Sequence, residues 1–250
     1  MSKLTSWWKS YFDKGYLTEY EPLFDLAQDR VQVARLVELL GLPAGSKVLD
    51  LACGQGRHAH LLAEAGFDVT GYDLSKHLLG EAKKRGTGRN LRYTRGDMRK
   101  LPMLWRRKFD AVVNLFTSFG FFADPADDAK VIRECARVLK PGGLMIWQGG
   151  SRDGVMARFL ESDWWESRDG TLIAQNREFD SVSGFLTIQS KWQKRAKVEY
   201  REHRIRLYTA TRLAELMLDA GLVVEQSYES FADEPLTRLS SEMLLVARKE

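Results

Sequence analysis

Short apolar runs alternate with longer stretches of helical spacing through the first 150 residues. The apolar runs are rich in Val, Ile, Leu and Phe and are bounded by Gly, Asp or Pro, which is typical of buried strands. They lie at residues 47–52, 67–74, 90–96, 109–116 and 143–150. Apolar positions at helical spacing predict helices near residues 28–40, 57–66, 76–86 and 124–139. This alternation predicts an α/β protein with a parallel sheet and helices on both of its faces.

The pattern changes in the second part of the chain. Residues 164–206 lack a helical stripe and contain strand-like pieces separated by turn signals such as Ser183-Gly184. We therefore expect an antiparallel β insertion at residues 164–206. A helix is expected at about 209–220, and two strand-like runs follow at 222–231 and 242–249. Since no helical stretch separates these two runs, they should pair antiparallel.

The composition fits one large domain, residues 1–250. Hydrophobic residues make up 44% of the 250 positions and charged residues 29%, so the chain can bury a sizeable core. No apolar run approaches about 18 residues, so neither a transmembrane helix nor a membrane partner is expected. The polar start has no apolar core of a signal peptide. The two cysteines, Cys53 and Cys135, are too few for a disulfide framework, which favours a cytoplasmic location.

The formal net charge of +4 is concentrated in one segment. Lys191–Arg206 holds seven cationic and two acidic residues. Such a segment either docks nucleic acid or an acidic substrate, or it is a solvated face. Few other basic residues cluster, so nucleic acid is not the expected partner. The sequence is compatible with a homo-oligomer and does not specify one.

A glycine-rich turn with acidic neighbours carries the candidate chemistry. The first predicted strand contains Asp50 and leads into Gly54-x-Gly56 and a helix. Glycines allow a tight turn and the close approach of a ligand. Asp73 ends the second strand 17 residues after Gly56, where a carboxylate can accept both hydroxyls of a ribose. Asp97 follows the third strand and could accept from an adenine amino group. The alternative role for Asp73 and Asp97 is helix capping.

The motifs VLDLACGQG, GYDLS, GDM, FDAVVNLFTSFGFF and LKPGG, in this order, resemble class I S-adenosylmethionine-dependent methyltransferases. The resemblance covers a core at residues 35–150 and 207–250. It implies a Rossmann-like, mostly parallel sheet of seven strands in the order 3-2-1-4-5-7-6, with strand 7 antiparallel. S-adenosylmethionine would lie across the carboxyl ends of strands 1, 2 and 4. The cofactor-binding residues that the resemblance implies in the core are Asp50, Cys53, Gly54, Gly56, Asp73, Leu74, Asp97, Met98 and Asn114.

A nicotinamide dinucleotide is the rival ligand for the same turn. Its pyrophosphate suits a helix N-terminus that has no carboxylate beside it. Asp50 instead suits a cofactor that carries an ammonium and a sulfonium group. The closing antiparallel strand pair also favours the methyltransferase arrangement.

The segments outside the core are similar to those of bacterial small-molecule N-methyltransferases, including sugar-amine and glycine N-methyltransferases. This resemblance implies that residues 1–34 form an aromatic, helical lid and that residues 164–206 cover the acceptor site. In such a lid Tyr16 or Tyr20 would close over the cofactor. The alternative for the aromatic residues near Trp7 is an apolar contact that holds the first helix to the core.

An apolar pocket after strand 4 is the expected acceptor site. Its expected lining is Phe116, Phe119, Phe121 and Trp147, with Arg204 and Arg206 at the rim to select a phosphate or carboxylate. Some sugar-amine N-methyltransferases carry a histidine where this chain has Phe121, so no catalytic residue is assigned. His203 either faces the acceptor or lies on the surface. No metal-ligand spacing is present, so no metal is expected.

The function that these observations favour is methyl transfer from S-adenosylmethionine to a small molecule, by an in-line displacement driven by proximity. Two alternatives stay open. One is an RNA or protein methyltransferase that docks its substrate on the basic insertion. The other is a protein that binds S-adenosylmethionine without turnover. The sequence specifies neither the acceptor nor the atom that is methylated.

Overall fold

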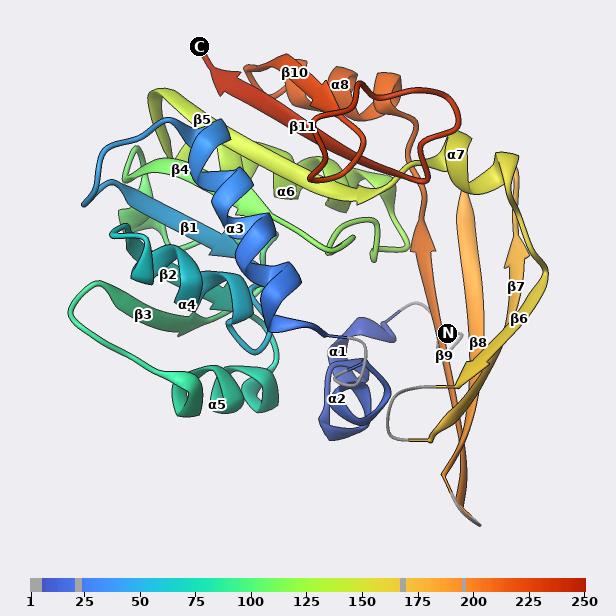
Figure 1. Ribbon diagram of the computed structural model, residues 1–250. Helices are drawn as coiled ribbons and strands as arrows, with labels where there is room; N and C mark the ends of the chain where they lie inside the picture. The colour runs from blue at the N-terminus through green and yellow to red at the C-terminus, as the bar shows by residue number, and fades with distance from the viewer. Residues whose placement is uncertain (1–5, 21–23, 167–169, 195–196) are drawn as a thin grey trace.

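The computed structural model describes residues 6–20, 24–166, 170–194 and 197–250. These residues form a seven-stranded mixed sheet with helices on both faces, and a separate four-stranded sheet beside it (Figure 1). The larger sheet contains β1 (Lys47–Leu51), β2 (Asp68–Asp73), β3 (Leu91–Arg95), β4 (Phe109–Asn114), β5 (Leu139–Gly150), β10 (Leu222–Tyr228) and β11 (Glu242–Lys249). Its order is β10-β11-β5-β4-β1-β2-β3, and β11 runs antiparallel to both neighbours. The predicted order and the antiparallel closing strand are therefore confirmed.

Four of the helices begin where a side chain accepts from a free backbone N–H. The helices are α1 (Trp8–Tyr11), α2 (Lys14–Tyr20), α3 (Leu26–Leu40), α4 (Arg57–Glu64), α5 (Lys76–Arg85), η3 (Met103–Trp105), α6 (Pro125–Val138), α7 (Arg152–Ala157) and α8 (Ala210–Leu218). Asp25, Ser75, Asp124 and Thr209 cap α3, α5, α6 and α8 in this way. The short helix α7 was not expected from the sequence. None of the described helices is long and apolar enough to cross a membrane.

The core lies on both faces of the larger sheet. On one face, Leu36 of α3 and Leu62 of α4 pack in the same cluster as Val48 of β1. On the other face, α6 and α8 pack in the cluster that contains Leu49 of β1. The central strands are therefore buried on both sides, which explains their continuous apolar runs. Ligands of such sheets bind at the carboxyl ends of the strands.

Strand β5 begins earlier than the sequence pattern predicted. Leu139 already pairs with Phe109 of β4, whereas Leu144 pairs with Ala111. Residues 140–143 of β5 therefore stand opposite the single residue Asp110 of β4, and Gly142 has a φ of +73°. The Pro-Gly-Gly signal does end α6, but the strand starts before this irregularity and continues after it.

The predicted β insertion is a four-stranded antiparallel sheet. It consists of β6 (Ser162–Glu166), β7 (Leu172–Phe179), β8 (Phe185–Lys194) and β9 (Lys197–Arg206), in that order. It starts two residues earlier than expected, at Ser162. Helices α1 and α2 lie beside β9, where the ring centroids of Tyr11 and His203 are 4.8 Å apart (Figure 1).

Candidate active site

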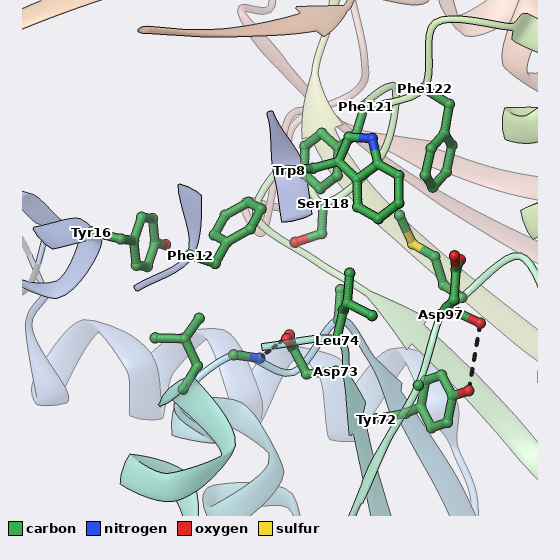
Figure 2. A pocket seen from close by; sticks show the side chains of 15 residues that line it. Trp8, Phe12, Tyr16, Tyr72, Asp73, Leu74, Asp97, Ser118, Phe121 and Phe122 are labelled. Atoms are coloured by element: carbon green, nitrogen blue, oxygen red, sulfur yellow. Dashed lines mark hydrogen bonds between the residues drawn. The ribbon is translucent and has the colours of Figure 1, made fainter. Parts of the chain in front are cut away.

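Two adjoining cavities open at the carboxyl ends of the central strands. The first lies over the ends of β1 and β2 (Figure 2). The second extends between the segment after β4, the N-terminal helices and the inner face of the β8–β9 pair. Residues from the N-terminal segment, the glycine turn and the segment after β4 line both cavities. They are Phe12, Tyr16, Ala52, Gly54, Ser118 and Phe121. The two cavities therefore share a wall at the point where they meet.

The turn after β1 is built from residues with left-handed backbone angles. The φ angles are +60° at Ala52, +54° at Gly54 and +73° at Gly56. A Cβ on Gly56 would lie 2.4 Å from the hydroxyl oxygen of Tyr93, so this position has no room for a side chain. Gly54 and Cys53 reach the cavity walls, whereas Gly56 shapes the turn and is not a lining residue of either cavity.

Asp73 lines the first cavity at the end of β2. Its Oδ2 accepts from the backbone N–H of Gly54 at 2.8 Å, and its Oδ1 accepts from that of Ser75 at 2.7 Å. Each carboxylate oxygen keeps acceptor capacity for a ligand. Figure 2 shows this carboxylate at one side of the cavity, beside Leu74. Asp73 therefore has both the expected placement and a local structural role.

Asp97 lines the first cavity together with Met98, as the resemblance implied. Its carboxylate forms an ion pair with Arg99, whose Nη2 donates to Oδ2 at 2.6 Å. Burial raises the pKa of Asp97 and the Arg99 hydrogen bonds lower it, with a net lowering. The carboxylate therefore stays ionised, and any bond to a ligand would add to its bond with Arg99.

Asp50 is a buried carboxylate in the wall of the second cavity, with 4% of its surface exposed. Burial and the neighbouring Asp73 charge raise its pKa to about 7. No ion pair to Asp50 forms within the described ranges, and the nearby Arg57 pairs with Asp29. A buried carboxylate without a cationic partner favours a positively charged ligand. This arrangement fits the ammonium group of S-adenosylmethionine.

The segment after β4 holds two strained residues at the second cavity. Phe116 and Thr117 have φ angles of +55° and +57°, a region that residues with a side chain avoid. The backbone N–H of Phe116 donates to Gln148 Oε1 at 2.7 Å, and Thr117 Oγ1 accepts from Gly150 N at 3.2 Å. Backbone strain of this kind clusters at functional sites.

Only part of the expected aromatic lining lies in a cavity wall. Phe116 and Phe121 line the second cavity. Phe119 and Trp147 are 1% and 2% exposed and pack edge to face with each other in the core, so neither lines these cavities. The expectation for these two residues was wrong, because both side chains point into the hydrophobic cluster that contains α6 and α8.

Asn114 is also fully buried and is absent from the walls of both cavities. Its Nδ2 donates to the carbonyl oxygen of Leu51 at 3.0 Å and to that of Ser118 at 3.4 Å. Asn114 thus ties the end of β4 to β1 and to the segment that lines the cavities. The structure assigns it a bracing role at this end of the sheet.

The prediction that Arg204 and Arg206 form a cationic rim of the acceptor pocket was also wrong. Side chains alternate along a strand, and His203 and Ile205 of β9 line the second cavity. Arg204 and Arg206 therefore lie on the opposite face of β9. Arg206 is 9% exposed and its Nη1 is 2.6 Å from Asp128 Oδ2, so it is an internal ion-pair partner and cannot meet an acceptor.

The N-terminal aromatic residues both pack on the core and line the cavities. The rings of Trp7 and Phe121 have centroids 5.2 Å apart, and so do those of Trp8 and Phe122. Tyr16 lines both cavities. Tyr20 lines the second. Burial raises the pKa of Tyr16 to about 12, so its phenol is neutral at pH 7.

His203 is the polar wall residue whose role the sequence left open. Its ring lies 4.8 Å from that of Tyr11 and 5.4 Å from that of Trp7. Burial, and secondarily the Arg201 charge, lower its pKa to about 4. Its Nδ1 is buried without a hydrogen-bond partner among the described residues. The imidazole is therefore neutral at pH 7 and has hydrogen-bonding capacity to spare.

Comparison with known proteins agrees with this geometry. Residues 48–143 match the family described as "Methyltransferase domain". The chain is 34% identical over 134 residues to a dTDP-3-amino-3,4,6-trideoxy-alpha-D-glucopyranose N,N-dimethyltransferase of Streptomyces venezuelae. This alignment covers 53% of this chain and 50% of that protein. It is 29% identical over 182 residues to a glycine/sarcosine N-methyltransferase of Halorhodospira halochloris. This alignment covers 71% of this chain and 68% of that protein.

A solved structure has the same fold. It is S-adenosylmethionine-bound CalS10, an amino pentose methyltransferase from Micromonospora echinaspora. The TM-score is 0.74 at 20% identity, with 95% of this chain and 97% of that chain covered. Residues 48–143 are therefore a methyltransferase domain, and the chain has the fold of a solved methyltransferase. The chain is an S-adenosylmethionine-dependent methyltransferase.

Proposed function

We propose that the chain transfers the methyl group of S-adenosylmethionine to a small-molecule acceptor held in the second cavity. The observation that carries this proposal is the shared wall of the two cavities at Gly54, Tyr16 and Ser118. A donor in the first cavity and an acceptor in the second would be neighbours there. The names of the relatives support a small acceptor, since they specify an amino sugar and glycine or sarcosine.

The residues of the first cavity suit the nucleoside of the cofactor. Asp73 would accept from the ribose hydroxyls, and Leu74 and Met98 would pack on the base. Asp50 and the Gly54 turn would hold the methionine part. When bound, the cofactor supplies a methyl group on a sulfonium, which is already a good leaving group. The face of Tyr16 at the shared wall would attract that positive charge.

The contribution of the chain to the reaction is alignment and exclusion of water. The second cavity has a volume of about 490 Å³, and the insertion contributes apolar side chains to its wall, among them Leu186, Ile188 and Ile205. Proximity and alignment can supply about 7–11 kcal/mol of a barrier. The neutral imidazole of His203 would orient the acceptor through a hydrogen bond. A neutral amine needs no base before methyl transfer, so the absence of an assigned base is consistent with this mechanism.

The basic segment favours a small acceptor over a macromolecular one. Arg201 Nη1 donates to Asp13 Oδ1 at 2.8 Å, and Arg206 is buried against Asp128. These two cations neutralise groups of the chain itself and are not free to dock RNA or protein.

The free thiols of Cys53 and Cys135 support a cytoplasmic location.

Calorimetry with S-adenosylmethionine and NADH tests the ligand assignment. We expect S-adenosylmethionine to bind with one site per chain and NADH to give no binding heat, because Asp50 disfavours a pyrophosphate beside the glycine turn. Micromolar binding of NADH with no signal from S-adenosylmethionine would contradict the proposal.

A further inference from the structure

We propose that Arg206 is a positioning residue that sets the affinity for S-adenosylmethionine from outside the cavities, by clamping residues 120–123 against β9. This inference rests on the proposed location of the cofactor in the first cavity. Arg206 is on the face of β9 opposite to that of His203, so its influence must pass through the backbone that it holds.

The clamp is a set of hydrogen bonds from one arginine to one short segment. Its backbone N–H donates to the carbonyl oxygen of Gly120 at 2.8 Å. Its Nη1 donates to the carbonyl oxygen of Phe122 at 3.1 Å and its Nη2 to that of Ala123 at 3.0 Å. Its Nε donates to the carbonyl oxygen of Ser183, in the turn between β7 and β8, at 3.2 Å. The planar guanidinium thus fixes the segment after β4 to the insertion.

The charge of the clamp is balanced inside the protein. Asp128 of α6 is fully buried, and its Oδ2 accepts from Arg206 Nη1 at 2.6 Å and from the Tyr208 hydroxyl at 2.7 Å. The Arg206 side chain is 9% exposed. A buried, charge-assisted pair with additional hydrogen bonds holds one geometry more firmly than an exposed pair. The clamp is therefore suited to hold residues 120–123 in one position.

The clamped segment has little room to move relative to β9. A Cβ on Gly120 would lie 2.3 Å from the carbonyl oxygen of Arg206, and the φ of Gly120 is +84°. The close approach of the two backbones therefore requires glycine at position 120. A change in the placement of β9 would displace the segment, and a displaced segment would disturb β9.

The clamped residues carry the cavity wall. Phe121 lines both cavities and Phe122 lines the first. The Phe122 ring lies 5.2 Å from that of Trp8 and 4.5 Å from the guanidinium of Arg99, which binds Asp97. Figure 2 shows Phe121, Phe122 and Trp8 on the side of the cavity opposite Asp73 and Leu74. Loosening the carbonyl groups of residues 122 and 123 would therefore loosen the wall that faces the proposed nucleoside.

The same strand also contributes to the second cavity. His203 and Ile205 line that cavity, while the next residue, Arg206, holds the wall of the first. The clamp would therefore couple ligand binding in the two cavities, and such coupling is reciprocal.

Calorimetric titration with S-adenosylhomocysteine tests the inference on three variants of the full chain. Arg206→Lys keeps the charge beside Asp128 but loses the planar fork. The double variant Arg206→Met with Asp128→Leu removes both buried charges and all side-chain bonds to the segment. Arg204→Lys is the matched control, because it makes the same change on the same face of β9. Arg204 also packs over the Phe185 ring, as Arg206 does, at 4.3 Å.

We expect both Arg206 variants to bind S-adenosylhomocysteine about tenfold more weakly than the native chain, a typical effect of a coupled residue that does not touch the ligand. Arg204→Lys should bind like the native chain. Amide hydrogen exchange in residues 119–123 should be faster in the Arg206 variants. Arg206→Lys retains both buried charges, and the double variant removes both. If one of these variants fails to fold, the other gives the result.

A lower melting temperature with unchanged affinity would overturn the inference, since Arg206 would then serve stability alone. Unchanged exchange in residues 119–123 would overturn it as well. Asp73→Ala, measured in parallel, separates the two claims. If Asp73→Ala weakens binding and the Arg206 variants do not, only the clamp fails. If Asp73→Ala leaves affinity unchanged, the proposed cofactor position itself fails.

Discussion

Replacing Asp73 with alanine should weaken binding of S-adenosylmethionine by about 1–3 kcal/mol, which is roughly 5- to 150-fold in Kd. The reason is that the ribose hydroxyls would lose a carboxylate that is held in place by the backbone N–H groups of Gly54 and Ser75. Calorimetry on the variant measures the effect, and circular dichroism should show that the fold is retained.

Asp124→Ala is a matched control for the loss of a local capping bond. Asp124 Oδ1 accepts from the backbone N–H two residues later, at Ala126, just as Asp73 does at Ser75. It lies at the start of α6 and lines neither cavity. This variant should bind the cofactor normally. If Asp73→Ala also bound normally, Asp73 would serve only the turn and the start of α5.

Cofactor affinity should increase as the pH rises towards 7, because of Asp50. The pKa of this carboxyl is raised from 3.8 to about 7 in the free protein, mainly by burial. A bound ammonium group would favour the ionised form, so binding should release a proton when it occurs below pH 7. The affinity should then fall about tenfold for each pH unit below the pKa of the free protein.

The raised pKa of Asp50 also determines how the stability of the fold changes with pH. Since the folded pKa of Asp50 is higher than the unfolded value, its contribution to stability is greatest below pH 3.8 and is lost as the pH rises through about 7. The bound ligand should reverse this loss. Calorimetry of S-adenosylhomocysteine between pH 5.5 and 7.5, in buffers of different ionisation enthalpy, measures both affinity and proton release. Asp50→Asn should remove the pH dependence, and a pH-independent Kd in the native chain would contradict the assignment.

The fold could be predicted from the sequence because its main signals are local. The apolar runs and the capping residues mark strands and helices without knowledge of their partners. The placement of β5 needed tertiary information, since Leu139 pairs with Phe109 before the irregularity at residues 140–143. The sequence pattern of Pro-Gly-Gly shows a break, but it does not show that pairing exists on both sides of the break.

The placement of the residues around the glycine turn could be predicted for a similar reason. Asp50, Gly54 and Asp73 follow directly from the strand ends, and the carboxyl ends of parallel strands meet at one edge of the sheet. The backbone angles of Gly54 and Gly56 agree with the expected tight turn. What the sequence did not show was that Asp97 shares its carboxylate with Arg99.

The acceptor side was harder to predict because it depends on which face of each strand is turned inward. A shift of one residue exchanges the two faces of a strand. The cations Arg204 and Arg206 attracted attention by their charge, yet the alternate residues His203 and Ile205 face the cavity. A strand pattern alone could not decide this, because both faces of β9 carry buried residues.

The aromatic residues after β4 show the same limit. Phe116 and Phe121 reach a cavity while Phe119, between them, packs against Trp147 in the core. Phe116 and Thr117 have left-handed φ angles, so the regular alternation of a strand does not continue through this segment. Glycine is the usual sequence signal for such angles, and neither of these residues is glycine, so the sequence carried no sign of the turn.

A crystal structure with S-adenosylhomocysteine bound tests the central claim most directly, because the claim concerns where the donor and acceptor meet. We expect the ribose hydroxyls within hydrogen-bonding distance of Asp73 and the base between Leu74 and Met98. The sulfur atom should lie at the shared wall near Tyr16, facing the cavity that His203 lines. A nucleoside bound away from Asp73, or a sulfur atom that faces away from the second cavity, would contradict the claim.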